Sequence, residues 1–206
     1  MDTLLGKVVE AVTESGRGGR TIVVVVGDHG EAFGEHPGSF THGVYLYNEG
    51  VHVPMLFYQP RLFAPGVVSE PTSHVDIVPT LLDALGVPYD PLALQGESVL
   101  RVLRRRYVFM VSPTAATTAS VSRHGIKLFI DDRHGRCTTY DLASDPEERR
   151  PMGCTGHEEQ MTALLMFRRH QDSILFRYNE ACRKPGRCPG ALAMRGAGPL
   201  PGGGHP

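Results

Sequence analysis

The chain has 206 residues, of which 41% are hydrophobic and 21% charged, and its net charge is −1. This composition fits a globular protein with a packed core, and the near-neutral charge gives no general argument for binding nucleic acid or an anionic membrane. No apolar run approaches the roughly 20 residues of a membrane-spanning helix, and the amphipathic, acid-containing start does not predict a signal peptide. We therefore expect one domain with appendages, no nucleic-acid partner and no membrane segment in this chain; its localisation stays open.

The first hundred residues predict alternating helices and strands. Leucines and valines recur at helical spacing over residues 4–12, and three glycines follow. The run TIVVVV (21–26) is typical of a strand buried on both faces, as in a parallel sheet flanked by helices. A second strand is predicted over VPMLFYQP (53–60). Residues 73–86 then predict a helix that begins at a serine and ends at a glycine.

A loop of about 25 residues separates the two predicted strands, and loops of this length are usually functional or disordered. Asp28 and His29 directly follow the valine strand, at the kind of strand end where open α/β sheets bind ligands. Carboxylate and imidazole groups bind divalent cations, so this pair is a candidate metal site; the alternative is a turn capped by the aspartate. His52 and His74 are interpreted as surface or structural residues. Further polar groups of the loop are Glu31, Glu35, His36 and His42.

The pattern changes after Gln95. Short strands joined by turns, the pattern of an antiparallel sheet, are predicted in three segments: 101–112, 119–131 and 136–143. The stretch DPEE suggests a helix-entry turn, and residues 158–183 predict a long helix. The Gly/Pro-rich end, residues 185–206, predicts a disordered tail. The basic run RVLRRR is interpreted as a solvated surface.

The four cysteines, Cys137, Cys154, Cys182 and Cys188, form no CxxC pair. A structural zinc site is therefore not expected. Their even number permits disulfides without showing them, so the disulfide state stays open.

Four motifs in a fixed order resemble the C-terminal half of the sulfatase family, within the alkaline-phosphatase-like superfamily: VVVVGDHGEAFGEH, THGVYLYNEGVHVPMLFY, SHVDIVPTLLDALGV and LQGESVL. The later SRHGIKLFIDDRHGRCTTYDLASDPEE is similar to the family's terminal small sheet. The resemblance covers about residues 1 to 150. It implies an α/β fold: the C-terminal part of a sulfatase-like mixed sheet flanked by helices, with a small antiparallel subdomain and a long C-terminal helix. The corresponding division is 1–100 for the catalytic part, 101–150 for the subdomain, 151–184 for the terminal helix and 185–206 for the tail.

The resemblance implies metal-dependent hydrolysis of sulfuric esters. Asp28 and His29 match the pair that ligates the catalytic divalent ion; calcium or manganese is expected first, and magnesium or zinc is also compatible because two ligands define no coordination geometry. His42 lies where many sulfatases have a sulfate-contacting lysine and where related phosphoesterase-like members have a histidine. It is the candidate catalytic and substrate-binding residue, able to orient an oxyanion or protonate a leaving group. His36 is a second candidate for substrate binding. The expected substrate is a sulfate or phosphate ester.

One departure from the family pattern concerns the nucleophile. Family members carry one or two aspartates on a first strand, and a nucleophile in a Cys/Ser-x-Pro-x-Arg motif or a threonine or serine at the corresponding helix start. Neither element occurs in these 206 residues. Ester transfer of this kind needs both a nucleophile and a metal, so we expect this chain to carry only part of an active site and to be inactive alone. It looks like a fragment, a truncated product or a remnant. The alternatives are a phosphodiesterase or phosphoethanolamine-transferase-like member, and a catalytically inactive binding or structural remnant; the oligomeric state stays open.

Overall fold

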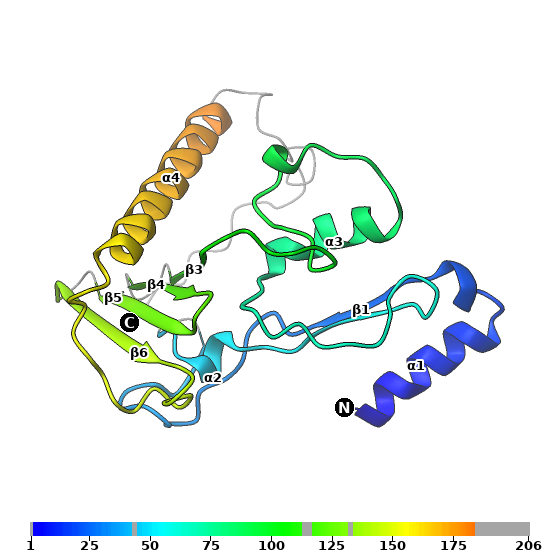
Figure 1. Cartoon of the computed structure of the whole chain (residues 1–206), viewed down its shortest axis with the longest axis horizontal. Coiled ribbons are helices and arrows are strands. Elements are labelled where there is room, and N and C mark those ends of the chain that lie inside the picture. Colours follow the sequence, from blue (N-terminus) through cyan, green and yellow to red (C-terminus); the bar gives the residue numbers. More distant parts are fainter. Residues whose placement is uncertain (1, 43–44, 113–116, 132–133, 184–206) are drawn as a thin grey trace, which may run out of the picture. The chain divides into compact units, whose positions relative to one another are not determined.

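The computed structural model describes residues 2–42, 45–112, 117–131 and 134–183 (Figure 1). The chain divides into two units, residues 1–164 and residues 165–206. The predicted tail lies outside the described residues. None of the helices in the described part of the chain is both long and apolar enough to cross a bilayer.

The first elements form where the sequence predicts them. Helix α1 spans Asp2–Glu14, and the short helix η1 spans Gly18–Arg20. Strand β1 (Val23–Val26) pairs with β2 (Met55–Tyr58), and the pairing is antiparallel.

The expectation that the valine strand is buried on both faces was wrong. Three of its valines are partly exposed, and Val26 is 36% exposed. The reason is that β1 pairs only with β2 within the described residues, and α1 buries none of its own side chains. A strand is buried on both faces only when other elements cover them.

Between β2 and the second sheet lie three short helical elements. Helix η2 spans His74–Asp76, α3 spans Ile77–Ala84 and η3 spans Pro91–Ala93. Ser73 and Gly86 flank η2 and α3 as predicted, and Gly86 takes a left-handed φ of 65° that favours glycine. The buried residues of α3 are Pro79 and Thr80, whereas Leu85, which follows the helix, is 58% exposed.

The predicted antiparallel sheet is confirmed. Its strands are β3 (Tyr107–Ser112), β4 (Thr117–Ser122), β5 (Ile126–Asp131) and β6 (Arg136–Asp141), paired in that order. Ala119 and Phe129 of this sheet form a buried cluster with Leu46, against which Tyr45 and Val51 pack. Helix α2 (Asn48–Val51) follows Leu46, so this part of the long loop is seated on the sheet.

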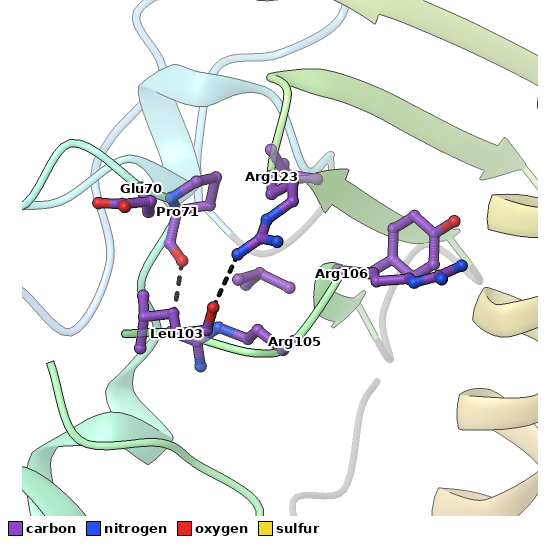
Figure 2. Close-up of a pocket in the computed structure, with 9 residues that line it drawn as sticks. Glu70, Pro71, Leu103, Arg105, Arg106 and Arg123 are labelled. Carbon is purple, nitrogen blue, oxygen red and sulfur yellow. Dashed lines mark hydrogen bonds between the residues drawn. The ribbon is translucent and has the colours of Figure 1, made fainter. Parts of the chain in front are cut away.

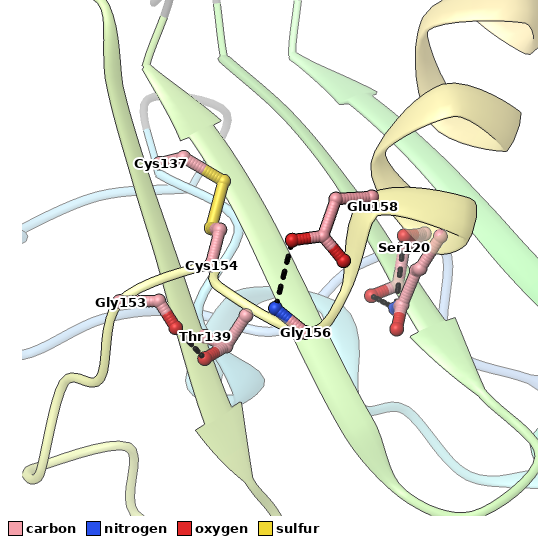
Figure 3. The surroundings of a disulfide bond; sticks show 8 residues. Ser120, Cys137, Thr139, Gly153, Cys154, Gly156 and Glu158 are labelled. Carbon is pink, nitrogen blue, oxygen red and sulfur yellow. Dashed lines mark hydrogen bonds between the residues drawn. A yellow bond between two sulfur atoms is a disulfide. The ribbon is translucent and has the colours of Figure 1, made fainter.

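Beyond β6 the chain turns back before the last helix, α4, which spans Glu158–Cys182. The stretch DPEE does form a turn, but the helix begins ten positions later, because Glu148 takes a left-handed φ of 53° that interrupts a helical path. A disulfide joins Cys137 of β6 to Cys154, with 5.9 Å between their Cα atoms (Figure 3). Next to it, the Thr139 hydroxyl donates to the carbonyl of Gly153.

Candidate functional site

The loop that follows β1 is held tightly against the chain before β2. The N–H of Gly27 donates to the carbonyl of Pro54 over 3.1 Å, and the N–H of Gly30 donates to the carbonyl of Gly50 over 2.9 Å. A Cβ atom at Gly30 would lie 2.0 Å from the carbonyl oxygen of Glu49, so only glycine permits this approach. The glycines of the GDHG motif therefore fix the backbone on either side of Asp28 and His29.

Asp28 and His29 form a compact pair in this turn. The backbone N–H of His29 donates to Asp28 Oδ1 over 3.0 Å, and Asp28 Oδ2 lies 3.5 Å from His29 Nε2. The His29 N–H and the charge of the His29 ring lower the pKa of Asp28. His29 Nδ1 donates to the carbonyl of Gly30 over 2.8 Å, because a carbonyl can only accept. This tautomer leaves the lone pair of Nε2 available on the side of the carboxylate.

This pair fits two ligands of one divalent ion. Ligands that each lie about 2.0–2.5 Å from an ion are roughly 3–4 Å apart, which matches the 3.5 Å between Asp28 Oδ2 and His29 Nε2. Metal-bound histidines commonly donate their second ring N–H to a carbonyl, as His29 does to Gly30. No group of three or more such ligands occurs among the described residues. Within the part of the chain that the structure describes, Asp28 and His29 are therefore a candidate pair of ligands and not a complete metal site.

His42 lies beside this pair. Its ring stacks on that of His29 with 3.9 Å between the ring centroids. Its Nδ1 lies 3.0 Å from Glu31 Oε2, so the carboxylate orients the ring. All four side chains are solvent-accessible. The structure thus brings together the two predicted metal ligands, the predicted catalytic histidine and Glu31.

His36 has different surroundings. It is buried, its Nδ1 lies 2.7 Å from Glu49 Oε1, and its Nε2 donates to the carbonyl of Glu148 over 3.1 Å. Its ring also stacks on Tyr47 with 3.7 Å between centroids. Both ring nitrogens of His36 are therefore engaged within the protein, whereas the His42 side chain is 49% exposed and contacts Glu31 through Nδ1.

Other residues near the loop carried weaker sequence signals. His74 Nε2 donates to the carbonyl of Gly27 over 2.8 Å, which agrees with its interpretation as a structural residue. Lys127 of β5 and Glu148 lie under α2, and both contact Asn48. In the sequence, both residues belong to the segment that is similar to the family's terminal small sheet, and nothing else marks them as neighbours of the loop.

A small pocket lies elsewhere, beside the basic run that precedes β3 (Figure 2). Its volume is about 10 Å³, room for roughly one water molecule. Arg105 is paired with the buried Asp76 through contacts of 2.5 and 2.6 Å. Arg123 donates to the carbonyl of Leu103 over 2.7 Å (Figure 2). These arginines stabilise the fold locally, and the pocket is too small for an ester substrate.

Comparisons with known proteins agree with the motifs. Residues 1–87 match the profile of the sulfatase family. Arylsulfatase K of Xenopus laevis is 34% identical over 166 residues, which cover 71% of this chain and 30% of that protein. The chain therefore spans about 30% of the length of this relative.

Solved structures show the same fold. The complex of BT4656 with its substrate D-glucosamine-2-N,6-O-disulfate matches with a TM-score of 0.59 at 20% identity, over 84% of this chain and 38% of that one. The phosphonate monoester hydrolase from Silicibacter pomeroyi matches with a TM-score of 0.58 at 23% identity, over 85% and 38%. The resemblance seen in the sequence is thus confirmed: residues 1–87 match the model of the sulfatase family, and the fold is shared with these solved structures.

Proposed function

We propose that this chain contributes the metal-binding loop of an enzyme that hydrolyses sulfuric esters. The observation that carries the proposal is the pair of Asp28 Oδ2 and His29 Nε2, 3.5 Å apart at the end of β1, with His42 stacked on His29. Family membership supports the reaction class. A divalent ion held by Asp28 and His29 would neutralise negative charge on the ester during cleavage.

His42 is assigned to the substrate. Its contact with Glu31 holds the ring through Nδ1 and leaves Nε2 for a substrate oxygen. A protonated His42 would donate a hydrogen bond to an oxyanion or a proton to a leaving group. His36 acts indirectly in this proposal, because both of its ring nitrogens contact the protein.

A second candidate is hydrolysis of a phosphorus ester. It is favoured by the histidine at position 42, where many sulfatases have lysine, and by the likeness of the fold to a phosphonate monoester hydrolase. A catalytically inactive remnant is the third candidate, and the missing nucleophile motif favours it for this chain taken alone.

The metal assignment is tested by isothermal titration of the full chain with Ca²⁺ and Mn²⁺. We expect weak binding that Asp28→Ala and His29→Ala each abolish, because each removes one of two ligands. His124→Ala, which removes an exposed histidine from the turn between β4 and β5, serves as the control and should bind like the wild type. Binding that survives both loop substitutions would refute the assignment.

A further inference from the structure

A buried ion pair joins the small sheet to the turn after it. Lys127 Nζ lies 2.7 Å from Glu148 Oε1, and neither side chain is exposed to solvent. Buried pairs of this kind add little stability compared with apolar side chains, because both charges lose their hydration. In some proteins they instead enforce one arrangement of the elements that they join. Glu148 also has a left-handed φ of 53°, which a non-glycine residue keeps only where its surroundings impose it.

Both members of the pair hold the first residue of α2. Lys127 Nζ donates to Asn48 Oδ1 over 3.1 Å, and the N–H of Asn48 donates to Glu148 Oε2 over 2.5 Å. Asn48 Nδ2 donates to the carbonyl of Pro146 over 3.1 Å. Three polar groups of Asn48 are thus bound by β5 and the turn after β6, and the apolar packing of Leu46 and Val51 seats the same segment on the sheet.

Helix α2 in turn holds the candidate metal loop. The Gly30 N–H donates to the carbonyl of Gly50 over 2.9 Å, and a Cβ atom at Gly30 would lie 2.0 Å from the carbonyl oxygen of Glu49. The Gly30 carbonyl accepts from His29 Nδ1 over 2.8 Å. Gly30 therefore contacts both partners: its N–H binds α2, and its carbonyl binds the ring of His29. His36 adds a second tie, since it contacts both the Glu49 side chain and the Glu148 carbonyl.

We infer that Lys127 and Glu148 are positioning residues of the candidate site: through Asn48 and Gly30 they hold His29 in the tautomer whose free Nε2 lies toward Asp28. Neither residue touches a metal or a substrate. This inference rests on the proposed function in one respect: His29 is taken to be a metal ligand, which Lys127 and Glu148 would orient. The arrangement itself can be measured without metal.

The test uses the full chain labelled with ¹⁵N at histidine, and the ring nitrogens of His29 are assigned with His29→Gln. At about pH 8, well above the ordinary pKa of histidine, the wild type should show a protonated Nδ1 and an unprotonated Nε2 at His29. The variant Lys127→Met/Glu148→Leu removes both charges together and so avoids an unpaired buried charge. We expect its His29 to lose the preference for the Nδ1–H tautomer while the protein stays folded.

Matched variants separate positioning from general destabilisation. Gln160→Met removes a buried side chain that donates to Ser120 and Ile126 of the same sheet, and His29 should keep the wild-type tautomer. Gly30→Ala forces the loop away from α2 and should reproduce the effect of the double variant. If the double variant does not fold, Asn48→Ala removes the side-chain contacts with Lys127 and Pro146 and is read in the same way.

A folded double variant, or Asn48→Ala in its place, with an unchanged His29 tautomer would overturn the inference. A Mn²⁺ titration of the same samples distinguishes it from the proposed function. If the wild type binds Mn²⁺, the double variant should bind it about 10-fold more weakly or worse, and Gln160→Met should not. If the wild type binds no metal but the tautomer changes as expected, the positioning role stands and the proposed metal role fails.

Discussion

Asp145, in the turn after β6, is expected to make the stability of the protein depend on pH. Its carboxylate accepts the N–H groups of Arg149 and Arg150 over 3.1 and 2.8 Å. Burial raises the pKa of Asp145, but these N–H groups and the two arginine charges outweigh burial, so the pKa is lowered overall. A lowered pKa in the folded state stabilises the protein above about pH 4, and that stabilisation is lost as the pH falls through the folded value.

We therefore predict that Asp145→Asn lowers the free energy of unfolding at pH 7 and that the difference from wild type shrinks as the pH falls below about 4, the ordinary pKa of aspartate. Urea denaturation at a series of pH values measures this difference. Asp172→Asn, on an exposed position of α4, should show no such trend. A difference between Asp145→Asn and wild type that stays constant with pH would contradict the prediction.

At the scale of single residues, the sequence predicts local neighbours well and distant partners poorly. Asp28 and His29 could be identified because the strand, the turn and both side chains lie within a few positions. His36 is predicted to bind substrate because it lies in the same loop, yet its ring contacts Glu49 and the carbonyl of Glu148, 112 positions away. No local pattern indicates such a contact, and the same holds for Lys127 and Asn48, 79 positions apart.

At the scale of elements, β5 and the turn after β6 depend on each other through one ion pair. Replacing Lys127 alone with methionine leaves the Glu148 carboxylate buried without a cation, which is expected to cost about 3–5 kcal/mol of unfolding free energy. Lys127→Met/Glu148→Leu should be close to wild type, because an apolar pair can replace a buried ion pair at little cost. Chemical denaturation of the two single variants and the double variant gives the coupling energy. Costs that simply add in the double variant would show that the two charges are not coupled.

The positions of the elements could be predicted because their patterns are local: three helices, two valine- or aromatic-rich strands and an antiparallel sheet form where the residues indicate. The burial of those elements could not. β1 has the composition of a fully covered strand, but its burial depends on neighbours that a local pattern does not contain. The DPEE turn similarly predicts a helix entry from its composition, whereas the left-handed Glu148 is imposed by contacts with Asn48 and Lys127.

At the scale of the whole molecule, the first sheet leaves apolar surface accessible. Among the described residues β1 and β2 pair only with each other, and Leu56 of β2 is 47% exposed. A groove of about 290 Å³ lies between α1 and these strands. Unpaired strand edges and apolar faces of this kind promote association.

We predict concentration-dependent self-association of the isolated chain, weakened by Leu56→Lys, which places a charge on the exposed face. Size-exclusion chromatography with light scattering measures it. Val67→Lys, at a fully exposed loop position, is the control and should associate like the wild type. A stable monomer at every concentration would show that this face does not drive association.

Catalysis is also a property of the whole site. Because these 206 residues contain no nucleophile motif of the family, we predict no turnover of aryl sulfates or bis-aryl phosphates by this chain alone, with Ca²⁺, Mn²⁺ or Zn²⁺ added. Loss of a nucleophile from a cooperating set of groups costs several powers of ten in rate. Activity should return in a longer chain that supplies the missing segments. Turnover by the 206-residue chain that Asp28→Ala abolishes would contradict this expectation.

The disulfide between Cys137 and Cys154 also affects the turn that lies between these two residues in the sequence. It closes a ring with a sequence separation of 17, and Glu148 lies within that ring. Closing a ring of this size removes conformational entropy from the unfolded chain, worth about 3 kcal/mol. Disulfides persist in oxidising surroundings and open under reducing ones. Reduction would therefore be expected to lower the stability of the turn that carries Glu148, and with it the support that this turn gives to Asn48.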